Sequence, residues 1–403
     1  MTTTTTSQIA EASRRGEDVR SDCWVEITLA DSGGIDLALT TKVESMYGES
    51  TRQLVRDELA ALGVTHARVE IEDAGALPFV ITARVEAAVR RLGFDVGDGY
   101  LVECGPGTDY ATQRDRFRRS RLYLPGNEPK FAINAGVHQP DGIILDLEDS
   151  VAPPQKDEAR LIVRNALRTI DFKGAERMVR INQGDRGLED LDFIVPHNVH
   201  LLLIPKVESA EQVRVVDART REILHERRIN TRVYLMPIVE SALGALRAFE
   251  IASATDRVVA LTIGLEDYTA DIGTARTKEA WESFWARSQV VNAARAAGVQ
   301  PIDSVFSDVA DTEGLRRNVL ESKSLGFDGM GCIHPRQIAV IHEAFAPADE
   351  ELAKARRIVE AFEEAQRRGL GVVSLGSKMI DPPVVKRAQR VVRLAEAMGM
   401  PRS

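Results

Sequence analysis

The stretch VVALTIGLED, residues 258–267, begins as an apolar run and ends on two adjacent carboxylates, Glu266 and Asp267. A short apolar run that ends at a glycine is consistent with a strand buried on both faces, which is the usual state of strands in a parallel sheet covered by helices. The stretch therefore predicts a core strand that carries an acidic pair into the loop at its carboxyl end.

The same pattern occurs in seven further runs of the chain. They are RLYLPG (121–126), GIILDLED (142–149), RMVRIN (177–182), HLLLIPKV (200–207), RVYLMPIVE (232–240), VQPIDSVF (299–306) and FDGMGCIHP (327–335). Most gaps between the runs hold a helical pattern, so the class is α/β, and eight units in roughly 220 residues predict a (β/α)8 TIM barrel. A doubly wound open sheet is the alternative. It usually carries a G-x-G-x-x-G turn after its first strand, which is missing here.

The parts of the chain outside the barrel give four further segments. We expect a disordered tail over 1–18, a small α+β domain over 19–100, a linker rich in glycine, proline and charge over 101–118, the barrel over 119–343, and a C-terminal helical extension over 344–403. Because few contacts cross such a linker, the small domain is expected to fold by itself.

Composition restricts the classes of function. The 403 residues are 44% hydrophobic and 28% charged, with a net charge of −9, so a nucleic-acid surface is not expected. No apolar run is long enough for a membrane span, and the first residues do not form a secretion signal. Three widely spaced cysteines suggest reduced thiols, so we expect a cytoplasmic protein.

Ionisable residues occupy almost every predicted strand end, where a TIM barrel builds its active site. They are Asp146, Glu148, Asp149, Arg180, Lys206, Glu208, Glu240, Glu266, Asp267, Asp303 and His334. Polar residues are expected at any strand end because loops contact water, but this density favours an active site. Glu240 and Asp267, on successive strand ends, suit Mg²⁺, which prefers carboxylates, substrate oxygens and water. Arg119 and Arg180 would supply positive charge for a carboxylate or enolate oxygen.

Several motifs give the chain a family resemblance. RSRLYLPGNEPKF, GIILDLEDSVAPPQKDEAR, PIVESALGA, IGLEDYTADIG, GFDGMGCIHPRQI and KMIDPPVVKRAQRV together resemble the citrate lyase β-subunit family, which includes the malyl-CoA and citramalyl-CoA lyases of the HpcH/HpaI aldolase group. The resemblance covers about 116–400. Residues 16–92, with SDCWVEITLADSGGIDLALTTKVESMYG and DAGALPFVITARVEAAV, resemble the citrate lyase acyl carrier subunit.

The resemblance implies a Mg²⁺-dependent carbon–carbon lyase. Its substrate would be a 3-hydroxyacyl thioester such as citryl-, citramalyl- or malyl-CoA, or the carrier-bound form, and its products an acetyl thioester and an oxo-acid. The implied roles are as follows: Glu240 and Asp267 bind Mg²⁺, Arg119 and Arg180 are catalytic and contact the acyl group, and Glu148, Asp149, Gly264, Leu265 and Glu266 bind the substrate.

Two implied features lie outside the barrel mouth. The resemblance implies that Asp381, in the motif KMID, acts as an acid/base and is supplied across a subunit interface. It therefore also implies a homo-oligomer, either a trimer or a hexamer. Gly376 and Ser377 replace the family's usual Asp-Gly before that motif. In the carrier family a serine bears a CoA-derived arm, and Arg20 holds its position here, so either Ser21 carries the arm or the arm has been lost.

Two other functions are compatible with the same residues. One is a thioester-independent oxo-acid aldolase of the same superfamily, and the other is a non-catalytic subunit of a citrate lyase-like complex. The ionisable strand ends weigh against the second.

Overall fold

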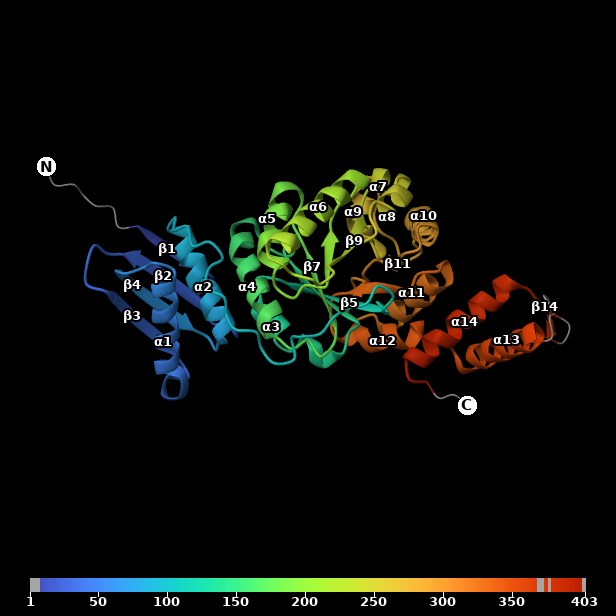
Figure 1. The fold of residues 1–403 in the computed structure, drawn as a ribbon, viewed down its shortest axis with the longest axis horizontal. Helices are drawn as coiled ribbons and strands as arrows, with labels where there is room; N and C mark the ends of the chain where they lie inside the picture. The colour runs from blue at the N-terminus through green and yellow to red at the C-terminus, as the bar shows by residue number, and fades with distance from the viewer. Residues whose placement is uncertain (1–7, 368–372, 376–377, 401–403) are drawn as a thin grey trace.

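The computed structural model describes residues 8–367, 373–375 and 378–400. Eight parallel strands close into a barrel in the order β10-β11-β12-β5-β6-β7-β8-β9 (Figure 1). The strands are β5 (Ser120–Pro125), β6 (Gly142–Asp146), β7 (Glu176–Arg180), β8 (Leu201–Ile204), β9 (Tyr234–Val239), β10 (Ala260–Ile263), β11 (Gln300–Asp303) and β12 (Gly329–Cys332). The predicted TIM barrel is confirmed, and each of the eight apolar runs supplies one strand.

Helices cover the outside of the barrel. They are α3 (Pro129–Ala132), α4 (Lys156–Thr169), α5 (Gly184–Ile194), α6 (Ala210–Glu226), α7 (Ala242–Leu246), α8 (Ala248–Ala252), α9 (Leu265–Asp271), α10 (Trp281–Ala297), α11 (Thr312–Leu325) and α12 (Arg336–Phe345). Two short 3-10 turns, η1 (Ala135–His138) and η2 (Pro153–Gln155), lie in the loops. The barrel interior is packed with apolar side chains such as Ile144, Met178 and Met236, so the lower part is a core and not a pore.

The N-terminal domain is a mixed sheet in the order β1-β2-β4-β3 with two helices. Its elements are β1 (Ile9–Ala12), β2 (Cys23–Leu29), β3 (Ile35–Thr41), α1 (Glu44–Ala61), β4 (Ala67–Asp73) and α2 (Pro78–Arg91). The expected disordered tail over 1–18 is wrong from residue 9 onward, because Ile9–Ala12 pairs antiparallel with β2. Residues 1–7 lie outside the described residues.

Helix α2 packs directly on α4 of the barrel, and the buried apolar core runs from one domain into the other (Figure 1). The predicted linker also lies against the barrel: the Tyr110 hydroxyl donates to the carbonyl of Ala175 at 2.7 Å, and Arg177 donates to the carbonyl of Thr108 at 2.7 Å. The linker therefore has many contacts with the barrel, contrary to the expectation from its composition.

The C-terminal extension is a helical hairpin of α13 (Asp349–Arg367) and α14 (Pro382–Ala397), with the short strands β13 (Val373–Leu375) and β14 (Lys378–Ile380) between them. Figure 1 shows the hairpin extending away from the barrel, with β14 at its far tip. Among the helices of the described residues, none combines the length and apolar character that crossing a bilayer requires.

Candidate active site

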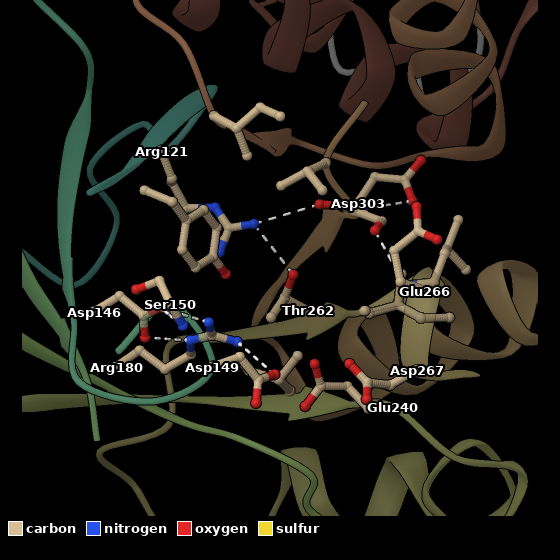
Figure 2. Close-up of a pocket in the computed structure, with 18 of the residues that line it drawn as sticks. Arg121, Asp146, Asp149, Ser150, Arg180, Glu240, Thr262, Glu266, Asp267 and Asp303 are labelled. Carbon is tan, nitrogen blue, oxygen red and sulfur yellow. Dashed lines mark hydrogen bonds and ion pairs between the residues drawn. The ribbon is translucent and has the colours of Figure 1, made fainter. Parts of the chain in front are cut away.

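A cavity of about 420 Å³ opens at the carboxyl ends of the barrel strands (Figure 2). Its wall includes residues that directly follow several strands, among them Gly264 after β10, Ser304 after β11 and Ile333 after β12. This is the end at which TIM barrels place their active sites, so the cavity is the candidate site.

Two carboxylates, Glu240 and Asp267, line this cavity from neighbouring strands. Glu240 follows β9, and Asp267 lies in the first turn of α9, which begins two residues after β10 ends. Lys206 contacts both: its backbone N–H donates to Oε2 of Glu240 at 2.7 Å, and its Nζ lies 3.2 Å from Oδ1 of Asp267. The acidic end of the stretch 258–267 therefore faces a second acid, as predicted from the order of the strands.

The two acids differ in their surroundings. Glu240 is only 6% exposed, and burial raises its pKa to about 7, with the negative charges of Asp267 and Glu148 adding to the effect. The Asp267 side chain is 42% exposed. A buried carboxylate beside other carboxylates favours a cation in the same place.

Gly264 makes room for Glu240. A Cβ on Gly264 would lie 2.5 Å from Oε1 of Glu240, closer than atoms can approach. The strand end therefore requires a residue without a side chain at this position, so that the carboxylate can occupy the space between β9 and β10.

The donor set fits Mg²⁺. Within 8–367, 373–375 and 378–400, no group of three or more histidine, cysteine, aspartate or glutamate side chains is placed to hold a metal by itself. Magnesium commonly uses only one or two protein carboxylates and keeps its other positions for water and substrate oxygens, so the pair Glu240 and Asp267 suffices.

Arg180, at the end of β7, holds the acids of the neighbouring loop. It forms a two-pronged pair with Asp146 at 2.6 Å for each contact, and its Nη1 lies 2.9 Å from Glu148 and 3.8 Å from Asp149. Burial would raise the pKa of Asp146, but the hydrogen bonds and charge of Arg180 lower it below its ordinary value. Burial raises the pKa of Glu148. The predicted residues Arg180 and Asp149 line the cavity, and Glu148, which is not among the lining residues, contacts both of them.

Gly264, Leu265 and Glu266 line the cavity as well. The Leu265 N–H donates to Oγ of Ser304 at 3.1 Å, which fixes the start of α9. Glu266 turns toward Arg276, 2.8 Å away.

The expectation that Arg119 reaches the barrel mouth is wrong. Arg119 precedes β5, at the amino end of the barrel, where its guanidinium forms a two-pronged pair with Asp141 at 2.8 Å. The cavity instead contains Arg121, which is not among the site residues predicted from the sequence. One feature of the sequence does indicate a role for Arg121: it is a charged residue in a run that is predicted to be a buried strand.

Asp381 does not line the cavity of its own chain. It is exposed and caps the start of α14, where its Oδ1 accepts from the N–H of Val384 at 3.2 Å. Gly376 and Ser377, the departures from the family motif, lie outside the described residues.

Comparison with known proteins identifies the family of the barrel. Residues 119–335 match the family model HpcH/HpaI aldolase/citrate lyase. The chain belongs to this family. It is a lyase of the citrate lyase β-subunit and malyl-CoA lyase group.

Relatives of the HpcH/HpaI aldolase/citrate lyase family align over most of their own length. The citrate lyase subunit beta of Leuconostoc mesenteroides is 39% identical, over 70% of this chain and 95% of that protein. The human mitochondrial citramalyl-CoA lyase is 36% identical, over 70% and 86%. Protein CitE of Mycobacterium tuberculosis, solved with magnesium, acetoacetate and coenzyme A, is 32% identical, with a TM-score of 0.58 over 70% of this chain and all (100%) of that one.

The N-terminal domain of this family member is carrier-like. Residues 15–92 match the acyl carrier model described as malonate decarboxylase delta subunit (MdcD), which confirms the resemblance to an acyl carrier. Ser21 begins the approach to β2 with φ of +54°, and its N–H donates to the carbonyl of Ala74 at 3.1 Å. Ser21 is remote in sequence from the barrel, but the next residue, Asp22, binds Arg84, which donates to the carbonyl of Asn127 in the loop after β5.

Proposed function

We propose that this chain is a Mg²⁺-dependent lyase that cleaves a 3-hydroxyacyl thioester to an acetyl thioester and an oxo-acid. The observation that carries the proposal is the pair Glu240 and Asp267, on neighbouring strand ends beside Arg180 in one cavity. Membership of the family and the magnesium in the M. tuberculosis relative support it.

Glu240 and Asp267 would hold the metal. Bound there, Mg²⁺ would supply Lewis acidity, which would lower the pKa of the substrate hydroxyl. Lys206 keeps Glu240 in place through its backbone N–H.

Arg180 would stabilise the charge that forms on the other half of the substrate. When the carbon–carbon bond breaks, its electron pair passes to the thioester as an enolate, because an α-carbanion next to a thioester is accessible. Arg180 lies in the cavity wall with its guanidinium fixed by Asp146, so it offers positive charge to the enolate oxygen without reorganising.

A second copy of the chain would supply the base. The hydroxyl proton must leave as the bond breaks, and the enolate carbon must gain a proton to give the acetyl group. Asp381 is exposed at the start of α14, in the hairpin that extends away from its own barrel (Figure 1). We propose that it does both in a neighbouring barrel. We therefore propose a homo-oligomer.

An apolar surface beside the cavity supports this assembly. It consists of exposed residues on α7, α8 and α10 and at the C-cap of α9, and α10 packs against each of the other three helices. These residues are Leu243, Leu246, Phe249, Ile272, Trp281, Phe284 and Trp285. Helix α9 also carries Asp267, so the surface adjoins the site. Large apolar side chains exposed on packed helices are typical of a contact with another protein, here proposed to be a second copy whose hairpin would complete the site.

Complementation between two inactive variants tests the shared site. Asp381→Ala lowers kcat by about 10²- to 10⁴-fold, the usual effect of removing an acid/base. Co-expression of Asp381→Ala with Glu240→Ala restores about a quarter of wild-type turnover, because random pairing leaves about one site in four with both residues intact. Normal turnover of Asp381→Ala, or no recovery in the mixed oligomer, would contradict the arrangement.

The thioester would be a soluble CoA ester. Arg20 occupies the position of the carrier family's modified serine, which favours loss of the arm. The contact of Arg84 with Asn127 nevertheless places Ser21 close to a loop at the barrel mouth, so an arm on Ser21 stays the alternative. The intact mass of the purified chain distinguishes the two.

The proposed reaction is tested by a cleavage assay. The full chain with Mg²⁺ is expected to release an oxo-acid from at least one of citryl-, citramalyl- and malyl-CoA, and chelation of the metal is expected to stop the release. Cleavage of a free hydroxy acid without CoA would instead favour a thioester-independent aldolase, and no cleavage of any of these compounds would refute the lyase.

A further inference from the structure

Arg121 lies inside the barrel at the inner end of the cavity. It is the second residue of β5, it is 1% exposed, and it lines the cavity together with Thr262 and Asp303. The residues beside it in register, Gly142 on β6 and Gly331 on β12, are both glycines. The absence of side chains on both neighbouring strands leaves room in the barrel for one long side chain.

The Arg121 guanidinium has no acidic partner among the described residues. Its contacts are all neutral: Sδ of Met236 at 3.0 Å, Oγ1 of Thr262 at 3.2 Å and the carbonyl of Asp303 at 3.3 Å. Its Nε has no hydrogen-bond partner. The acids nearest in the cavity wall are already paired, because Asp303 binds Arg287 and Asp146 binds Arg180.

Other arginines with equally low exposure show what this chain does with a buried guanidinium. Arg118, Arg164 and Arg287 are each at most 1% exposed, and each contacts a carboxylate at 2.7 Å or less: Glu176, Glu86 and Asp303, respectively. Arg121 is the exception among them. Burying a cation without a counter-ion is costly, so the position is expected to receive an anion from outside the protein.

The position of Arg121 relative to the two acids identifies that anion. Figure 2 shows Glu240 and Asp267 on one side of the cavity and Arg121 on the other, with Thr262 between them. If the proposed function holds, the acids fix the substrate through the hydroxyl-bearing carbon and its carboxylate, and the thioester leads out to the mouth. The remaining substituent of that carbon then points inward, toward Arg121.

We propose that Arg121 binds a second carboxylate of the substrate, carried on this inward substituent, so that the oxo-acid released is a dicarboxylate. A two-pronged contact between a guanidinium and a carboxylate uses the donors that are now unpaired, including Nε. A hydrogen or a methyl group in the same place leaves the cation buried and unpaired. Arg121 is thus a specificity residue that favours citryl-type thioesters over malyl and citramalyl thioesters.

The inference rests on the proposed function and is tested by binding of the oxo-acid product alone. The full chain with Mg²⁺ is titrated with oxaloacetate, which has the second carboxylate, and with pyruvate, which has a methyl group. We expect oxaloacetate to bind about 10- to 100-fold more tightly, as a hydrogen bond to a charged group predicts. Arg121→Met is expected to lose this preference and keep its affinity for pyruvate, and Arg121→Lys to retain part of the preference.

Thermal unfolding gives a second measurement, with Arg287→Met as the matched control. Without ligand, Arg121→Met is expected to unfold at the same temperature as wild type or higher, because it removes an unpaired buried charge, whereas Arg287→Met unfolds lower because it leaves Asp303 unpaired. Oxaloacetate is expected to raise the unfolding temperature of wild type but not of Arg121→Met.

The outcomes separate the two proposals. Equal affinity of wild type for both acids, or an unchanged preference in Arg121→Met, overturns the role of Arg121 and leaves the lyase standing. Binding of neither acid in the presence of Mg²⁺ overturns both.

Discussion

Replacing Glu240 or Asp267 with alanine is expected to abolish lyase turnover while the barrel stays folded. Each side chain supplies one of the two protein ligands of the proposed metal, and removing either one halves the negative charge that the protein offers to Mg²⁺. Loss of the Lewis acid leaves the substrate hydroxyl at its ordinary pKa. We expect kcat/KM to fall by about a thousandfold or more, which corresponds to about 4 kcal/mol of transition-state stabilisation.

Titration calorimetry with Mg²⁺ and circular dichroism check this result. Neither variant is expected to bind the metal measurably, and both should keep the wild-type spectrum. Asp271→Ala is the matched control, because Asp271 lies on the same helix as Asp267 but does not line the cavity. Unchanged Mg²⁺ affinity in both ligand variants would show that the metal, if any, binds elsewhere.

The barrel could be predicted from the sequence because its strands are buried on both faces and therefore appear as short apolar runs. The prediction that Glu240 and Asp267 lie close together has the same basis, since consecutive strands of a barrel are neighbours and their carboxyl ends meet. These predictions depend on local pattern and chain order alone.

The errors at the site have a physical reason as well. Arg119 precedes its strand and so lies at the amino end of the barrel, where it pairs with Asp141. Arg121 is within the strand and shares a face with Tyr123, which also lines the cavity, because side chains alternate along a strand. Because buried strand positions are usually apolar, Arg121 was not predicted to be a site residue, although a charged residue at such a position usually has a function.

The relation of the carrier-like domain to the barrel could not be read from the linker. Glycine, proline and charge in 101–118 suggested a flexible connection, but the domains are joined through α2 and α4, which are far apart in sequence. The contact depends on which side chains of the two helices meet, and no local pattern encodes that.

The interface between α2 and α4 contains buried charged side chains that form ion pairs with one another. Arg84 of α2 is 2% exposed and contacts Asp22 at 2.8 Å and Glu158 of α4 at 3.0 Å. Arg164 of α4 contacts Glu86 of α2 at 2.7 Å, and both are at most 1% exposed. Each domain therefore supplies counter-ions for the other.

Arg84→Ala is expected to destabilise the whole chain by about 3–5 kcal/mol, because the buried Asp22 loses its cation and the buried Glu158 keeps only its longer contact with Arg91, at 3.6 Å. Denaturant unfolding of the full chain measures the change. The control is Arg15→Ala, whose pairs with Glu70 and Glu72 lie on the exposed face of the small sheet, so its effect should stay within about 1 kcal/mol.

Removing residues 1–118 is expected to have a larger effect than Arg84→Ala. The deletion exposes the apolar surface of α4 and leaves both Glu158 and Arg164 without their partners, so the remaining 119–403 should aggregate or unfold at lower denaturant concentration. This differs from the expectation, based on the composition of the linker, that the small domain folds by itself. A soluble 119–403 fragment with wild-type stability, or Arg84→Ala with an unchanged unfolding midpoint, would show that the two domains are energetically independent and that the carrier-like domain is free to move relative to the site.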